Sequence, residues 1–295
     1  MLSVFSKIRL RNEWTSWHIV AALAMIAVSV GVTLDAWRDI LHIASRDEES
    51  SHVFLVPIVV AWLAWVRARR LRHCRIVGNW VGPALVLVGW AMYSLGDTYL
   101  FQSVWHGGAV VIVVGCLITV VGKDLLIQML PAFVALMFLV PVPGRVRQQV
   151  AIPLERVTAQ VTQGLFEVLG VPVERSGNVL SINGAEVAIA EACNGLRMVF
   201  ALTLVSFAFA FGTPLRGYVR FLILAACPVS AVICNVVRLV PTVWLYGYHP
   251  GPIAEHFHNV GGWVMLGASF LVLMGIIRLL RWALIPVTQY TLAYD

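Results

Sequence analysis

The stretch VLSINGAEVAIAEACNGLRMVFALTLVSFAFA, residues 179–210, changes character twice along its length. Apolar residues on both sides of Asn183-Gly184 predict a β-hairpin, because this pair tolerates the positive φ angles of a type I′ turn. A short polar group around Cys193 comes next, and an apolar run over 195–212 then has nearly the length of a membrane span. The stretch therefore predicts a small hairpin that leads directly to a thiol at the start of a membrane helix.

The composition of the whole chain is that of a polytopic membrane protein. Of its 295 residues, 60% are hydrophobic and only 12% are charged, which is more apolar surface than a soluble domain can hide. Eleven Trp and 13 Phe fit aromatic residues at two membrane interfaces. The formal net charge of +6 does not indicate nucleic-acid binding, because the basic residues lie in short loops between apolar segments, where positive-inside topology places them.

We predict an all-α membrane protein with about eight spans, which form a single domain over residues 1–295. The first apolar stretch is longer than the apolar part of a signal peptide and indicates a span. Basic groups border the spans on one side, so both termini face the cytoplasm, and the more acidic loop 35–51 faces outward. The predicted spans are 17–36, 52–66, 79–96, 105–121, 125–141, 195–212, 218–246 and 260–280.

One segment does not follow this pattern. Residues 142–192 are too polar for a simple span, and their first half has apolar residues at mixed three- and four-residue spacing. This spacing predicts an amphipathic helix that lies at the outer membrane interface, ahead of the hairpin. The apolar positions are Val150, Leu154, Val157, Val161, Leu165 and Val168.

Cys193 differs in its setting from an ordinary membrane cysteine. The chain has five cysteines and no C-x-x-C pair, so neither a disulfide framework nor a zinc ribbon is expected. At the start of a helix, the positive end of the macrodipole favours the thiolate form of Cys193. Asn194 can cap this helix, and Gly195 permits the close approach of another backbone. The alternative is a small buried residue with no chemistry.

Arg238 lies in the outer half of the seventh predicted span. An arginine in an apolar span is costly and usually faces a polar cavity or a partner, although it can also extend to the outer headgroups. Asn235 lies three residues earlier and shares its helix face, so the two donors are typical of a binding surface. Because arginine keeps its proton, we assign Arg238 to charge stabilisation.

His258 and His256 lie just before the last predicted span. Histidine is the side chain best suited to exchange a proton near neutral pH, and an interfacial histidine without chemistry is the alternative. Two residues apart on a helix, the two side chains point to different faces, so only one is expected to reach Cys193. The E-H-F-H cluster, residues 255–258, could also suggest a metal site. No other His or Cys group has the spacing of metal ligands, so we expect neither a metal nor an organic cofactor.

With these residues identified, the chain resembles the exosortase/archaeosortase family, polytopic membrane proteins regarded as cysteine transpeptidases. The family's Cys–small polar–Gly, N-x-x-R and H-x-x-x-G motifs match residues 193–195, 235–238 and 258–262, in that order. The stretch SSHVFLVPIVVAWLAW, 50–65, is similar to the family's early Ser-His-x-x-x-x-P span. The last motif selects His258 over His256. The likeness extends from about residue 45 to 280, and Asn194 stands where the family commonly has serine.

The resemblance implies a peptidase mechanism. Cys193 attacks a peptide carbonyl to form a thioester, His258 transfers the proton to the leaving amine, and Arg238 stabilises the oxyanion. The implied substrates are exported proteins with a C-terminal sorting tail, made of a Pro-Glu-Pro-like motif, a membrane helix and a basic cluster. The expected location is the bacterial inner membrane, with the catalytic residues at its outer face. Candidate positioning or substrate-binding residues are Asn194, Gly195, Asn235, Glu255 and Gly262.

Two other functions are compatible with these residues. In a membrane permease, Arg238 and the histidines would bind a small anion, and Cys193 would be dispensable. In a non-catalytic factor that assists polysaccharide or protein export, loss of the thiol would change nothing. The expected partners are tailed substrate proteins and the lipid bilayer, without nucleic acid.

Overall fold

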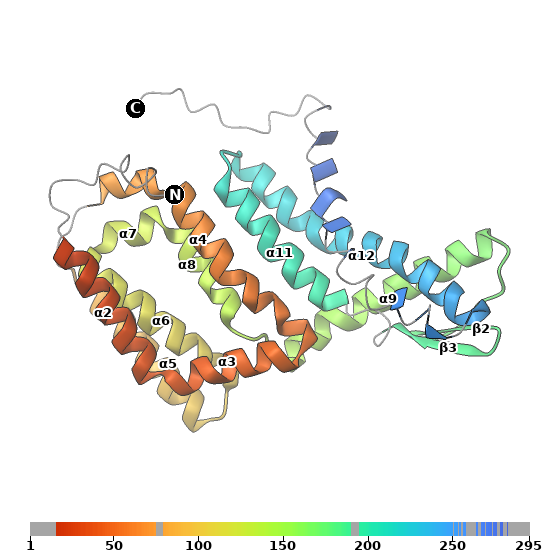
Figure 1. The fold of residues 1–295 in the computed structure, drawn as a ribbon, viewed down its shortest axis with the longest axis horizontal. Coiled ribbons are helices and arrows are strands. Elements are labelled where there is room, and N and C mark those ends of the chain that lie inside the picture. The colour runs from red at the N-terminus through yellow and green to blue at the C-terminus, as the bar shows by residue number, and fades with distance from the viewer. Residues whose placement is uncertain are drawn as a thin grey trace. The chain divides into compact units, whose positions relative to one another are not determined.

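The computed structural model describes residues 16–74, 79–189 and 195–249, and scattered residues from 251 to 282. Its described part is mostly helical with one small antiparallel sheet (Figure 1). Contacts divide the chain into two compact units, Met1–Pro143 and Gly144–Asp295. The single domain expected over the whole chain stays a prediction, because two compact units can belong to one domain.

The first unit is helical throughout its described residues. Within it, α5 and α6 pack along their whole lengths and lie side by side in Figure 1. The elements are α2 (Ser16–Val32), α3 (Leu34–Arg46), η1 (Glu48–Leu55), α4 (Val56–Val66), η2 (Ala68–His73), α5 (Val81–Thr98), α6 (Gln102–Val121), α7 (Lys123–Gln128), α8 (Leu130–Leu136) and η3 (Met137–Leu139).

Glycines at seven-residue spacing explain how closely α5 and α6 approach. Gly82, Gly89 and Gly96 are all buried on one face of α5. A Cβ atom added at Gly89 would lie 2.8 Å from the backbone nitrogen of Ile112 on α6, which is closer than real Cβ atoms come. Small residues let membrane helices come into van der Waals contact, which drives their association in lipid.

The described part of the second unit combines three long helices with the sheet. Its core joins the inner face of the sheet to α9 and to the C-terminal half of α12, through Leu180, Ile182, Val187, Ala159, Phe166, Leu239 and Val243. The elements are α9 (Gly144–Val168), β1 (Glu174–Ser176), β2 (Val179–Ile182), β3 (Ala185–Ala188), α11 (Gly195–Gly212) and α12 (Gly217–Tyr248).

The predicted hairpin is confirmed, and a third strand extends it. β2 and β3 pair antiparallel around Asn183 and Gly184, whose φ angles of 51° and 79° fit a type I′ turn. β1 pairs with the other side of β2 through a second two-residue turn, Gly177-Asn178, in which the φ of Gly177 is 63°. A Gly-Asn pair is itself a hairpin signal, so the sequence contained the information for this strand.

The chain is a helical membrane protein, but eight spans are not confirmed. Three described helical segments are long and apolar enough to cross a membrane, and two bent helix pairs raise that number to at most five. The predicted span 260–280 lies largely outside the described residues. The three segments are Glu49–Val66, Gln102–Val121 and Gly217–Tyr248.

The loop predicted over 35–51 is wrong, because most of it is helical. After α2 the chain bends by 76° and continues as α3. α3 buries Ala36, Ile40 and Ala44 at four-residue spacing and leaves charged side chains outside. This is the pattern of an amphipathic helix. Its charged face lowers the mean hydropathy of the segment, so that the segment resembles a polar loop.

The predicted span 125–141 is also interrupted. α7 ends at Gln128, and α8 begins at Leu130 with Pro131 in its first turn. Proline is favoured at that position because it cannot donate the backbone hydrogen bond that a continuous helix needs.

The amphipathic helix predicted in the segment 142–192 is observed as α9. Five of the six residues in its predicted apolar stripe lie on the surface, between 41% and 85% exposed: Val150, Val157, Val161, Leu165 and Val168. The sixth, Leu154, is half-buried and packs against α11 and α12. Small and hydroxyl side chains, together with one phenylalanine, form the buried face instead. An exposed apolar stripe is what a helix at a lipid interface needs.

Candidate functional site

Arg238 and Asn235 are both buried on α12, with exposed fractions of 7% and 4%. Their three-residue spacing puts them on one helix face, as the sequence predicts. An arginine that extends to headgroups leaves its charged end in solvent, so the burial of Arg238 argues against that alternative. The two side chains therefore face the protein interior.

The sheet packs on the C-terminal half of α12, directly after Arg238. α12 has 32 residues and is roughly 48 Å long, against the ~30 Å of a bilayer core. Leu239 and Val243, immediately after Arg238, pack against the sheet. Strands with exposed Glu174 and Glu186 and with open edges are not tolerated in lipid. Arg238 therefore lies immediately before the part of α12 that carries the sheet.

The packing of α11 on α12 places the start of α11 at the same level. Two apolar clusters show that the helices run antiparallel, namely Ala210 with Val219 and Ile223, and Val199 and Leu202 with Cys227 and Ala231. Continuing this register by about one turn puts Gly195, the first residue of α11, level with Asn235. The N-terminus of α11 and the polar face of α12 thus lie at the same height.

The remaining predicted site residues lie outside the described residues. These are Cys193, Asn194, Glu255, His258 and Gly262. Of the histidine pair, His256 is described and exposed, whereas Ala254 on the same short helical segment is buried. His256 therefore points away from the protein interior.

The four described cysteines are all buried free thiols: Cys74, Cys116, Cys227 and Cys234. Cys74 lies outside the candidate spans, where burial, assisted by the negative charge of Asp124, raises its pKa above the ordinary value. A thiol with a raised pKa is a poor nucleophile because little thiolate is present at neutral pH. The described cysteines therefore have the inert setting that is the ordinary one for a membrane cysteine.

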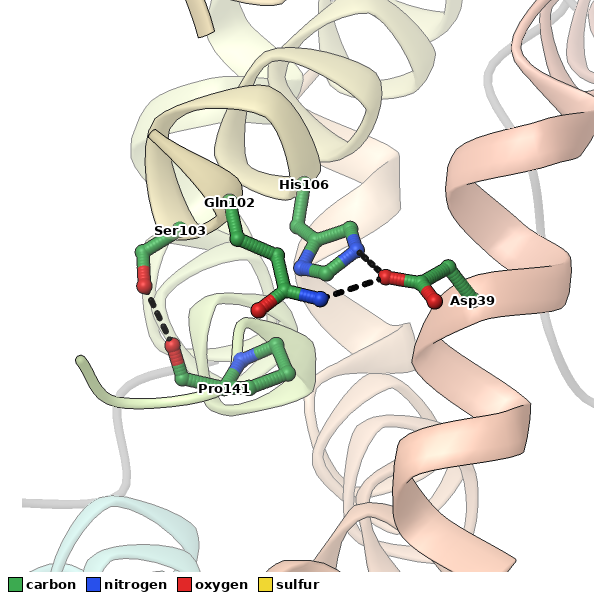
Figure 2. A network of polar contacts seen from close by, with 5 residues as sticks. All are labelled: Asp39, Gln102, Ser103, His106 and Pro141. Carbon is green, nitrogen blue, oxygen red and sulfur yellow. Dashed lines mark hydrogen bonds and ion pairs between the residues drawn. The ribbon is translucent and has the colours of Figure 1, made fainter. Parts of the chain in front are cut away.

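A polar network in the first unit was not predicted from the sequence. Asp39 on α3 accepts a hydrogen bond from the Nε2 of Gln102 at 2.8 Å and contacts the Nε2 of His106 at 3.0 Å (Figure 2). His106 is completely buried, and the side chain of Asp39 is one-third exposed. Ser103, on the same turn of α6, donates to the carbonyl oxygen of Pro141 at 2.7 Å. His106 is an ionisable residue within the predicted span 105–121, and such a residue usually indicates a polar partner.

This network connects two helices by side-chain hydrogen bonds. A carboxylate only accepts hydrogen bonds, so His106 holds its proton on Nε2 and donates it to Asp39. The bond connects α3, which follows a sharp bend, to the start of α6. Among the described residues, no three His, Cys, Asp or Glu side chains lie close enough together to hold a metal ion.

A comparison with protein families gives a match over most of the chain. Residues 37–275 match the model of the transmembrane exosortases, which covers most of the chain. No curated protein and no solved structure matches the chain.

Proposed function

Because the chain belongs to the transmembrane exosortase family, we propose that it is a membrane-embedded cysteine transpeptidase with Cys193 as its nucleophile. One observation carries the assignment of the site. Buried Arg238 and Asn235 lie level with the start of α11, and Cys193 is two residues before that start in the sequence. Acyl transfer to a thiol needs a stabilised thiolate and a stabilised oxyanion. A helix N-terminus favours the thiolate, and a permanently charged donor at the same height stabilises the oxyanion.

The proposed reaction has two steps. The Cys193 thiolate attacks a peptide carbonyl carbon, and the carbonyl electron pair moves to oxygen beside Arg238. The intermediate then collapses to a thioester, and the C–N bond breaks as His258 gives its proton to the leaving amine. Water or an acceptor amine then attacks the thioester and gives its proton to His258. The C–S bond breaks, which releases the mature protein and restores the Cys193 thiolate and the protonated His258. No step requires a metal or an organic cofactor.

Burial is the reason that Arg238 suits this role. A fixed positive charge in a low-dielectric site stabilises a developing oxyanion more strongly than a hydrated charge does. Asn235, on the same face, is assigned to orienting the reacting groups. Asn194, Gly195, Glu255 and Gly262 complete the group of positioning or substrate-binding residues. The exposure of His256 supports the choice of His258 as the proton carrier.

The proposed substrates are exported proteins that end in a sorting tail. We place the protein in the bacterial inner membrane with both termini in the cytoplasm and the sheet on the outer side. The substrate's membrane helix would lie among the spans, and its basic end would stay in the cytoplasm. Its sorting motif would then reach the level of Arg238, where α12 leaves the hydrocarbon.

A cleavage assay in membranes tests this function. The protein is co-expressed with a secreted reporter that carries a candidate tail, and wild type is compared with Cys193→Ser and Cys193→Ala. We expect only the wild type to shorten the reporter and to form a trappable thioester. Cys116→Ala is the matched control, because Cys116 is a buried cysteine of the first unit, and this variant should process the tail normally.

The outcomes separate the candidate functions. Processing by both Cys193 variants would reject the peptidase. Transport of a small anion that depends on Arg238 and not on Cys193 would indicate a permease. A non-catalytic assembly factor would be indicated if the deletion strain has an export defect and a Cys193→Ala copy restores export fully.

A further inference from the structure

β3 is an edge strand that leads into the proposed nucleophile. The sheet order is β1-β2-β3, so only one side of β3 pairs with another strand. Among the described residues, no backbone hydrogen bond reaches its other side. Ala188 is the last residue of β3, and Cys193 follows five residues later. Five extended residues span at most about 17 Å, so the strand lies within a short reach of the thiol.

The register of the hairpin determines which backbone groups face outward. Ile182 and Ala185 close a two-residue turn, and the backbone nitrogen of Ile189 donates to the oxygen of Asn178 at 2.9 Å. Because hydrogen-bonded positions alternate along an antiparallel strand, Ala185, Val187 and Ile189 bond toward β2. Glu186 and Ala188 therefore point their N–H and C=O groups away from the sheet.

Side-chain contacts hold this edge in place. The Nδ2 of Asn183 donates to the carbonyl oxygen of Gly247 at the end of α12, at 3.3 Å. On the other side, the Nδ2 of Asn178 donates to Glu155 of α9 at 2.9 Å. Val187 of β3 is buried in the core that the sheet forms with both helices. The edge is thus a rigid template, and Figure 1 shows the strands beside the C-terminal end of α12.

We propose that the outer edge of β3 binds the extended substrate segment that precedes the cleaved bond, as one added strand. This inference rests on the proposed function and names the subsite that would select the sorting motif. Strand addition uses the backbone hydrogen-bonding groups of an edge and places alternate peptide side chains on its two faces. A substrate strand bound to β3 would lie beside the strand that leads to Cys193. The scissile carbonyl of the substrate would thereby be brought toward the thiol.

The small size of the edge favours a substrate over a second copy of the protein. Glu186 and Ala188 offer only two N–H and two C=O groups. Natural proteins keep edge strands short to prevent pairing between copies. A contact of this size is weak and reversible, which suits a peptide that is held for one reaction and then released.

Backbone methylation of the substrate tests the proposal without altering the protein. Synthetic tail peptides carry a single N-methyl amide at successive positions before the cleaved bond, and their Kd is measured for Cys193→Ala in nanodiscs. An N-methyl group removes one donor, so we expect Kd to rise roughly threefold to tenfold at alternate positions only. A loss that is equal at every position, or no loss at any, would overturn the edge proposal.

A matched pair of protein variants gives an independent measurement. Ala188→Pro removes an outward N–H, which an edge strand tolerates, whereas Ala188→Val keeps it. We expect the proline variant alone to lose peptide affinity, at an unchanged Tm. Equal affinities would count against the proposal.

Processing of the same peptides by the wild type separates the two proposals. If alternate positions matter for binding while no peptide is cleaved, the edge stands and the transpeptidase assignment fails. If the peptides are cleaved and methylation has a uniform effect, the transpeptidase stands and the edge proposal fails.

Discussion

Arg238 is buried on α12 immediately before the residues that pack against the sheet, so its charge acts in a low-dielectric setting at the proposed site. We predict that Arg238→Gln lowers kcat about 10²- to 10³-fold, the usual cost of losing one donor to an oxyanion. Arg238→Lys keeps the charge but loses the planar fork of donors, so an intermediate rate is expected. Single-turnover cleavage of the tail in nanodiscs measures both.

Loss of folding would imitate loss of catalysis at such a buried position. Thermal unfolding of each variant therefore accompanies the rates, and Val237→Ala provides a control on the exposed side of the same helical turn. A well-folded Arg238→Gln protein that cleaves at the wild-type rate would show that Arg238 does not stabilise the transition state.

The Asp39–His106 contact allows a prediction about stability in the first unit. Asp39→Ala leaves a completely buried imidazole N–H without its acceptor, which costs about 1–3 kcal/mol. His106→Leu removes the donor as well, so the double variant should be less destabilised than the sum of the single variants. Unfolding in detergent measures the three free energies. If the free-energy losses of the two single variants add up to that of the double variant, Asp39 and His106 do not stabilise each other.

At the scale of elements, the α5–α6 pair depends on the absence of side chains along one helix face. We predict that Gly89→Ala destabilises the pair by about 1–3 kcal/mol, the usual cost of overpacking, although alanine is the better helix former. Gly31→Ala is the matched control, because an added Cβ atom at Gly31 meets nothing within 4 Å. The control should be neutral or stabilising. Equal unfolding temperatures for the two variants would contradict this packing.

Elements defined by local chemistry were predictable from the sequence, and those defined by their surroundings were not. The turn at Asn183-Gly184 follows from two residues that accept positive φ, so the hairpin could be predicted. α3 was mistaken for a loop because its charged face lowers the average hydropathy, while Ile40 and its neighbours are buried by other helices. The 76° bend between α2 and α3 is likewise a tertiary feature, which no hydropathy pattern encodes.

At the scale of the molecule, the sequence indicated which residues to bring together but not how. Cys193 and Arg238 are 45 positions apart. The predicted topology put both on the outer side and the motif order connected them, but neither gave their relative heights. The antiparallel register of α11 and α12 supplies the missing geometry in the second unit, because it sets Gly195 level with Asn235. The Asp39–His106 contact was missed for a related reason, since a supposed loop and a predicted span gave no cause to pair them.

The proposed topology makes a prediction about the sidedness of the whole molecule. With the sheet on the outer side, Glu186→Cys should react with a membrane-impermeant maleimide in intact spheroplasts. Arg69→Cys, an exposed position in the basic segment after α4, should react only after the membrane is opened. The background is low in a Cys193→Ala protein, because the other four cysteines are buried and the pKa of Cys74 is raised.

The reverse labelling pattern would place the sheet in the cytoplasm. Arg238, which lies where α12 meets the sheet, would then be on the side that an exported sorting motif has already left. A basic cluster at the end of the tail would likewise have to cross the membrane, which positive-inside topology opposes. Such a result would therefore reject both the orientation and the exported substrates, whereas the expected pattern leaves the cleaved bond and Cys193 on the same side.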